Sequence, residues 1–205
     1  MSKTNSRIKA FQSASNPDQE YEDAFQGNCS TVKENLRKAR KENPDLLVKI
    51  ARANGISVSA LKRARHGRSG LGLHDDNLVY TYPGGLKISY TSREPRTGWL
   101  YGKASAPWRM DRVKPETTTI YLTECENDAI ALIGCGLGSN KDTVVVASPY
   151  ATFPKPWAKR FAGKHVILCP TSDSAEQAKV AGYLQGYALS VKITSKESVM
   201  SSSTR

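Results

Sequence analysis

The sequence predicts an α/β fold in which a small, mostly parallel sheet is flanked by helices and preceded by a basic helical segment and a β-hairpin. Three observations support this prediction. Residues 120–193 alternate short apolar runs with helical runs in the order β-α-β-β-α-β, residues 77–90 alternate with period two, and residues 30–67 show helical spacing. The sheet is expected to be mostly parallel because strands joined by helical crossovers run in the same direction.

Length and composition allow one sizeable core and a smaller appendage, since the chain has 205 residues of which 39% are hydrophobic. The first stretch is rich in Ser, Asn, Gln and acidic residues and the last ends in Ser-Ser-Ser-Thr-Arg, so both are predicted to be disordered. We expect no membrane association and a cytoplasmic location, because no apolar signal region or membrane-spanning stretch is present. The expected segments are a disordered extension (1–28), a basic helical segment (29–68), a β-hairpin with a linker (69–119), an α/β domain (120–194) and a disordered tail (195–205).

The net charge of +11 is concentrated in the basic helical segment. Between Lys33 and Arg68 the sequence has eleven Lys or Arg against three acidic residues, whereas residues 120–193 have seven basic against six acidic side chains. Clustered positive charge favours a polyanionic partner such as DNA, although a solvated helical face would show the same pattern. The candidate nucleic-acid contacts in this segment are Lys62, Arg63, Arg65 and Arg68.

Three helices are predicted in this segment, at residues 30–41, 44–53 and 57–67. Pro44 suits the first turn of the second helix, and Ser57 suits the N-cap of the third. The last two helices have the spacing of a helix-turn-helix, whose second helix would present basic residues to DNA. A plain helical hairpin explains the pattern equally well.

A β-hairpin is predicted at residues 77–90. Apolar and polar residues alternate on both sides of a Pro83-Gly84-Gly85 turn, and this combination is typical of two antiparallel strands.

Two acidic clusters follow strands of the α/β domain. Glu124 follows the strand predicted at residues 120–123, and Asp173 follows the strand predicted at residues 165–169. Because the carboxyl ends of neighbouring parallel strands lie at the same edge of a sheet, the clusters are expected to converge on one crevice. The other predicted elements of the domain are strands at 143–147 and 191–193 and helices at 126–134 and 174–189.

The first cluster resembles a motif of the TOPRIM domain, the metal-binding module shared by bacterial and phage-type DNA primases, topoisomerases and some nucleases. The family's motif is usually Glu-Gly-Glu-x-Asp-Ala, and Glu124, Glu126, Asp128 and Ala129 match it. The hairpin and the linker after it also resemble the segment that joins the catalytic region of a primase to its TOPRIM half.

The second cluster resembles the family's Asp-x-Asp motif, which is usually followed by x-Ala-Gly. Aligning Ala175 with the family's Ala places Asp173 on the second Asp and Thr171 on the first. The chain departs from the pattern at three positions, because Cys125 replaces a Gly, Thr171 replaces an Asp and Glu176 replaces a Gly.

The resemblance implies a site for Mg²⁺, with Mn²⁺ as an alternative, whose candidate ligands are Glu124, Asp173, Glu176 and Thr171. It implies catalytic roles for Glu124, Asp128 and Asp173, with Glu124 as a ligand or general base. Thr171 brings no charge to the cation, and Glu176 could supply the missing acid. Asp128 and Glu176 also lie near predicted helix N-termini, where acidic residues are favourable without a metal.

A second basic cluster surrounds Trp157 and consists of Lys155, Lys159 and Arg160. This Trp could stack a nucleobase beside cations that bind phosphate. Packing against the sheet is the commoner fate of a Trp, so both interpretations stay open.

The resulting hypothesis is a primase-like protein that acts in the replication of a phage or mobile element by metal-dependent nucleotidyl transfer. It would act on a single-stranded DNA template, with a separate replicative helicase as a candidate partner. One alternative is a TOPRIM fold that has lost catalysis and binds nucleic acid or a replication partner, and another is a TOPRIM nuclease.

The four cysteines form no Cys-x-x-Cys pair, which argues against a zinc ribbon.

Overall fold

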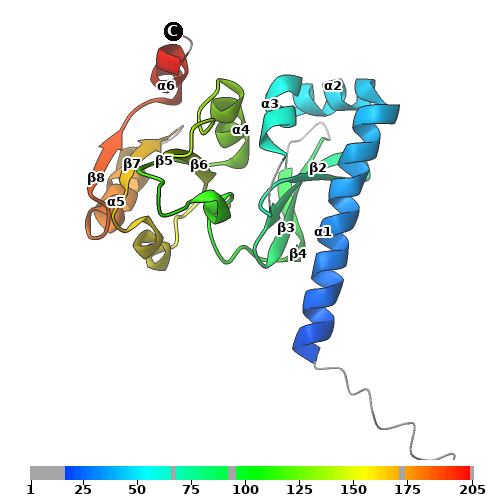
Figure 1. Cartoon of the computed structure of the whole chain (residues 1–205), viewed down its shortest axis with the longest axis horizontal. Coiled ribbons are helices and arrows are strands. Elements are labelled where there is room, and N and C mark those ends of the chain that lie inside the picture. Colours follow the sequence, from blue (N-terminus) through cyan, green and yellow to red (C-terminus); the bar gives the residue numbers. More distant parts are fainter. Residues whose placement is uncertain (1–16, 66–67, 92–95, 171–173, 204–205) are drawn as a thin grey trace, which may run out of the picture.

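The structure is a computed structural model that describes residues 17–65, 68–91, 96–170 and 174–203. In these residues two four-stranded sheets lie side by side (Figure 1). The N-terminal half contains α1 (Pro17–Glu42), α2 (Pro44–Ala53), α3 (Val58–Ala64), β1 (Leu71–His74), β2 (Asn77–Tyr82), β3 (Gly85–Tyr90) and β4 (Arg96–Gly102). The C-terminal half contains the 3₁₀ turns η1 (Met110–Arg112) and η2 (Lys155–Phe161), the helices α4 (Glu126–Gly134), α5 (Ser174–Gln185) and α6 (Lys196–Ser203), and the strands β5 (Thr119–Thr123), β6 (Thr143–Ala147), β7 (His165–Cys169) and β8 (Ser190–Ile193).

The first sheet is antiparallel, with strand order β1-β2-β3-β4. Strands β2 and β3 form a hairpin that turns at Pro83 and Gly84, and Gly84 has a φ of 80°, which glycine adopts without strain. Successive residues of β2 point to opposite faces, so that Val79 packs with α1 whereas Tyr80 packs toward the second sheet. The hairpin predicted at residues 77–90 is confirmed.

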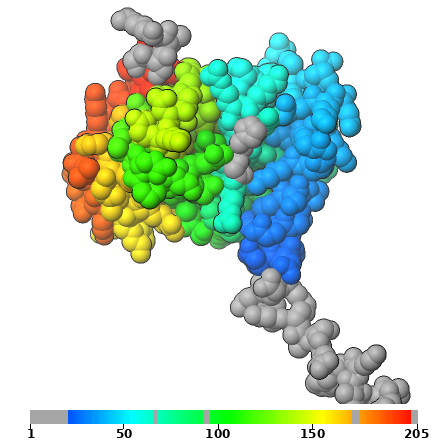
Figure 2. Space-filling view, in the orientation of Figure 1, coloured from blue at the N-terminus to red at the C-terminus, as the bar shows by residue number. Residues whose placement is uncertain are grey.

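Helix α1 covers the outer face of the antiparallel sheet (Figure 1). Phe25 and Val32 of the helix are buried in one apolar cluster with Ile88 of β3. Val32 also lies against Gly72 of β1, where an added Cβ would come within 2.6 Å of the valine Cγ2. A glycine at this position therefore lets the helix lie close to the strand. In Figure 2 the N-terminal end of α1 extends beyond the body formed by the two sheets.

The second sheet is parallel, with strand order β6-β5-β7-β8. Thr123 at the end of β5 pairs with Ala147 of β6 and Cys169 of β7, so these three strands end at one edge. Helix α4 packs on one face, and α5 with η2 packs on the other. Residues 144–146 are all buried because both faces are covered. These features confirm the predicted α/β class with a parallel sheet flanked by helices.

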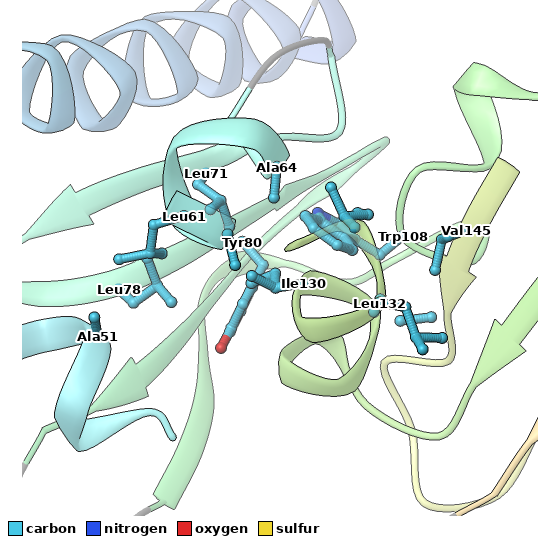
Figure 3. Packing of buried hydrophobic residues seen from close by; sticks show 14 of the residues in the cluster. Ala51, Leu61, Ala64, Leu71, Leu78, Tyr80, Trp108, Ile130, Leu132 and Val145 are labelled. Carbon is cyan, nitrogen blue, oxygen red and sulfur yellow. The ribbon is translucent and has the colours of Figure 1, made fainter. Parts of the chain in front are cut away.

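A continuous apolar core joins the two sheets. Tyr80 of the first sheet, Ile130 and Leu132 of α4, and Trp108 of the connecting segment lie together in it (Figure 3). The backbone N–H of Trp108 donates to the carbonyl oxygen of Ala147 at 2.9 Å, which attaches the connecting segment to the outer strand β6.

A buried ion pair crosses the same junction. The Nζ of Lys87 on β3 lies 2.8 Å from Oε1 and 3.0 Å from Oε2 of Glu126, the first residue of α4. The same ammonium donates to the carbonyl oxygen of Pro149 at 2.9 Å, and the hydroxyl of Tyr82 donates to Glu126. Lys87 is 8% exposed and Glu126 is 2% exposed, so the two charges are removed from water together.

Two expectations of disorder are wrong for the described residues. Helix α1 begins at Pro17, so residues 17–28 are helical, and Phe25 is buried because its spacing places it on the face that meets the sheet. Helix α6 covers most of the expected tail, and its Val199 is buried in the core that contains α4. These two segments contain few apolar residues, so their sequences show little helical periodicity. In the folded chain Phe25 packs against the antiparallel sheet and Val199 packs in the core with α4.

The other helix predictions agree with the structure apart from their ends. The helix expected at residues 30–41 is the last part of α1, and the second matches α2. Ser57 caps α3, since its Oγ accepts from the N–H of Ala60 at 3.1 Å. The helix expected at residues 174–189 ends at Gln185.

We predict that Gly134→Ala destabilises the protein by about 1–3 kcal/mol, because the added Cβ would lie 2.6 Å from the Cβ of Ala60 and force α3 away from α4. Gly182→Ala in α5 is the matched control, since nothing lies within 4 Å of its added Cβ. The control should gain roughly 0.5–1 kcal/mol from the higher helix propensity of alanine. Urea unfolding of both variants measures this, and an unchanged midpoint for Gly134→Ala would contradict the close packing of the two helices.

We predict that Lys87→Met costs about 3–5 kcal/mol of unfolding free energy, because it leaves the carboxylate of Glu126 buried without its cation. The double variant Lys87→Met with Glu126→Gln should recover part of this loss, since it removes the second charge as well. Chemical denaturation of the wild type, Lys87→Met, Glu126→Gln alone and the double variant forms a double-mutant cycle. Additive losses would show that the pair contributes no coupling.

Candidate functional site

A small pocket with a cavity volume of about 40 Å³ opens where β5, β6 and β7 end. Glu124, directly after β5, and Glu176, in the first turn of α5, both line it. The other lining residues are Leu122, Thr123, Ser148, Tyr150, Ala151, Phe153, Leu168, Cys169, Pro170, Gln177 and Val180. The topology thus brings two candidate acids to one mostly apolar crevice at the carboxyl edge of the sheet.

The two carboxylate oxygens of Glu176 have different surroundings within the part of the chain that the structure describes. Its Oε2 lies 3.5 Å from Nζ of Lys179, one helical turn further on. Its Oε1 is buried and, among the described residues, has no hydrogen-bond partner. A buried carboxylate oxygen without a donor is costly, and a cation or an N–H of a ligand would satisfy it.

Asp128 does not line this pocket, and its carboxylate is bound by neighbouring side chains. Its Oδ1 accepts from Nζ of Lys196 on α6 at 2.5 Å, and its Oδ2 accepts from Sγ of Cys125 at 3.0 Å. The carboxylate raises the pKa of Lys196 above its usual value through this hydrogen bond. Asp128 therefore attaches α6 to the start of α4, a structural role that sequence reasoning did not predict.

The two cysteines near the site are neutral thiols. Burial, with help from the hydrogen bond to Asp128, raises the pKa of Cys125 to about 12. Burial also raises the pKa of Cys169 to about 12, with a smaller contribution from the charge of Asp128. Without a bound metal, both side chains therefore carry no charge at neutral pH.

Glu126, the second acid of the first motif, is enclosed by Lys87 and Tyr82 at the junction of the sheets. Burial, with the nearby charge of Glu126, raises the pKa of Tyr82 well above its usual value, so the phenol remains a donor. Glu126 holds the two sheets together and does not line the pocket of Glu124.

The basic residues of the helical segment differ in how the fold uses them. Lys62 and Arg68 are exposed, and Arg65 is partly buried. Arg63 donates from Nη1 to the carbonyl oxygen of Gly134 at 2.7 Å. Since this carbonyl lies at the C-terminal end of α4, where a cation is favourable, Arg63 supports the contact of α3 with α4.

The second basic cluster lies on η2, in the connection between β6 and β7. Nζ of Lys155 lies 5.6 Å from the centre of the Tyr183 ring, and Nη2 of Arg160 donates to the carbonyl oxygen of Ser105 at 3.2 Å. Lys159 is exposed. Trp157, in the same turn, is partly buried between two other aromatic rings.

Thr171 and Asp173 lie outside the described residues, so the Asp-x-Asp part of the second motif is not placed. Within the described ranges, no group of three or more His, Cys, Asp or Glu side chains is arranged to hold a metal ion. In the same residues no helix is long and apolar enough to cross a membrane.

The sequence analysis predicted no role for three residues of this region: Lys87, Tyr150 and Lys196. Lys87 had one available signal, because it is a charged residue at an inward position of an alternating strand. Tyr150 and Lys196 had no local signal, since their partners are distant in sequence.

No protein-family model matches the chain, and no curated protein matches its sequence. The fold is similar to that of the Aquifex aeolicus primase, in a structure of its zinc-binding and RNA polymerase domains, with a TM-score of 0.59 and 14% sequence identity over 91% of this chain. The primase fragment of the bacteriophage T7 primase-helicase protein is also similar, with a TM-score of 0.45 and 17% identity over 70% of this chain. The chain spans 59% and 62% of the lengths of those two chains. The protein therefore has a primase-like fold.

Proposed function

We propose that this chain is a TOPRIM protein that acts as a DNA primase in the replication of a phage or mobile element. The observation that carries the proposal is the placement of Glu124 and Glu176 in one pocket at the carboxyl edge of the parallel sheet. The primase-like fold supports it, because the first acidic motif lies at the end of a central strand of that fold.

The pocket at this edge of the sheet contains carboxylates, the type of ligand that a hard divalent cation prefers. Mg²⁺ prefers carboxylate oxygens, and the pocket contains Glu124 together with an oxygen of Glu176 that has no donor among the described residues. We propose these two acids and Asp173 as ligands, with Thr171 beside them, and Mn²⁺ as an alternative ion. A bound cation would neutralise phosphate charge and help to ionise a hydroxyl group.

Side chains of the protein would orient the reacting hydroxyl and bind the template. Glu124 would orient the attacking hydroxyl or accept its proton. The exposed cations Lys62 and Arg68 would attract the phosphates of a DNA template through long-range electrostatics, with Lys159 at the other basic cluster. Arg63 and Asp128 are expected to contribute through the packing of α4, since both are bound by neighbouring groups. A separate replicative helicase stays a prediction.

One observation favours a second candidate function, a binding module without catalysis. Asp128, which matches a family acid, is paired with Lys196, and the sequence has Thr171 where the family has an Asp. A protein that has lost both acids from its reacting centre could keep the fold and bind nucleic acid or a replication partner.

We predict that the protein makes primers on single-stranded DNA with Mg²⁺ and that Glu124→Gln reduces this activity at least a hundredfold, because it removes a charged ligand or base. Mg²⁺ should also raise the melting temperature of the wild-type protein, since an ion that binds only the folded state stabilises it. The measurements are primer synthesis and thermal melting against Mg²⁺ concentration.

Glu116→Gln is the matched control, because Glu116 is an exposed acid outside the pocket and its loss should change neither readout. If the wild-type protein makes no primers and melts at the same temperature with and without Mg²⁺, the proposed primase activity is wrong and the binding module is favoured.

We predict that Thr171→Asp increases Mg²⁺-dependent primer synthesis and makes stability more dependent on Mg²⁺, because it restores the paired carboxylates that a hard cation prefers. Without metal the same change should lower the melting temperature, since like charges at 171 and 173 repel each other. Melting curves with Mg²⁺ and with a chelator measure the effect. Equal melting temperatures for variant and wild type in both conditions would argue against a cation at this position.

A further inference from the structure

A row of aromatic side chains crosses the junction of the two sheets and is not used by the chemistry above. Neighbouring ring centres lie 5.5 to 6.3 Å apart along the whole row. The rings follow one another in the order Tyr82, Trp99, Tyr150, Trp157, Phe153 and Phe161.

The middle of this row is partly exposed, whereas its ends belong to the core. Tyr82 and Phe161 are 2% and 0% exposed. Trp99, Tyr150 and Trp157 are only partly buried. The planes of Tyr150 and its two neighbours are inclined at 42°, so these rings are not stacked face to face. Aromatic surface that remains in contact with water in this way is available to a planar apolar group.

Tyr150 connects the row to the pocket of Glu124. It follows β6 and lines that pocket together with Ser148. Its hydroxyl donates to the carbonyl oxygen of Ala104 at 3.2 Å, and its own carbonyl oxygen accepts from Oγ of Ser148 at 3.0 Å. The hydroxyl of the ring and the backbone of the residue are therefore both held by polar contacts, so Tyr150 would lose little further side-chain entropy when a ligand packs against it.

Exposed cations lie in the same turn as one ring of the row, and a nucleic acid likewise carries planar bases and charged phosphates side by side. Lys155, Lys159 and Arg160 are exposed and belong to the same 3₁₀ turn as Trp157. A chain of bases linked by phosphates matches this combination of aromatic rings and positive charge better than a peptide or a lipid does.

We propose that Trp99, Tyr150 and Trp157 form a stacking surface for the bases of single-stranded DNA, with the backbone phosphates on the cations of η2. A base on Tyr150 would lie next to the pocket of Glu124, so the surface would guide the strand toward that pocket. This inference rests on the proposed function for its choice of DNA as ligand, but it concerns binding and requires no catalysis.

The test compares a labelled oligothymidylate with an abasic strand of the same length and the same number of phosphates, by fluorescence anisotropy without Mg²⁺ at fixed salt. The wild-type protein should bind the oligothymidylate more tightly by roughly five- to a hundredfold, the range that one stacked base supplies. Quenching of tryptophan fluorescence should accompany binding of the oligothymidylate and should be weaker with the abasic strand.

Trp157→Leu should weaken binding of the oligothymidylate roughly tenfold and leave the affinity for the abasic strand unchanged. Trp99→Leu provides a second variant if the first one does not fold, and thermal melting checks both. Tyr187→Leu is the matched control, because this tyrosine is 52% exposed and lies outside the row, so both affinities should stay as in the wild type.

Equal affinity of the wild-type protein for the two strands would overturn the stacking surface, as would a variant that weakens both strands alike. The result is distinguishable from the catalytic test. Base-dependent binding without primer synthesis would support the stacking surface and contradict the proposed primase activity. Primer synthesis without base-dependent binding would support the primase activity and contradict the stacking surface.

Discussion

The ion pair of Lys87 and Glu126 is the contact on which the arrangement of the two sheets depends. It joins the middle of the antiparallel sheet to the first residue of α4, and it is buried together with the hydroxyl of Tyr82. Two charges removed from water are tolerable only while they are paired, so separating the sheets here would leave an uncompensated buried charge. Glu124, which lines the pocket, directly follows β5 and precedes this ion pair in the same short segment.

One short segment supplies three acids with three different uses. Glu124 lines the pocket, Glu126 joins the sheets and Asp128 binds Lys196 of α6. The neighbouring Tyr80 adds to the same junction, since its hydroxyl donates to Oδ1 of Asn127 at 2.6 Å and burial raises its pKa well above the usual value. A segment with so many fixed contacts holds the pocket carboxylate on a rigid support, which is the condition for a preorganised site.

Most of the fold could be predicted from the sequence, because its elements carry strong local signals. The strand at residues 143–147 and the helix at residues 126–134 match the structure from end to end, since apolar runs and turn residues mark their limits. The roles of Glu126 and Asp128 could not be predicted, because they depend on partners that are distant in sequence, 39 residues away for Lys87 and 68 residues away for Lys196. The first part of α1 was not predicted for a similar reason, since Phe25 is buried only when the helix packs against the antiparallel sheet.

The two outer strands of the parallel sheet are protected from other chains in unequal ways. The end of β6 already bonds to the backbone of Trp108, which occupies groups that an incoming strand would need. At the opposite side, β8 is the last strand, and Leu189 and Ile193 are 67% and 46% exposed around it. Exposed Lys192 lies between them, and a charge on an edge strand opposes pairing with another chain. Solubility at high concentration should therefore depend more on this one lysine than on any residue of the opposite edge.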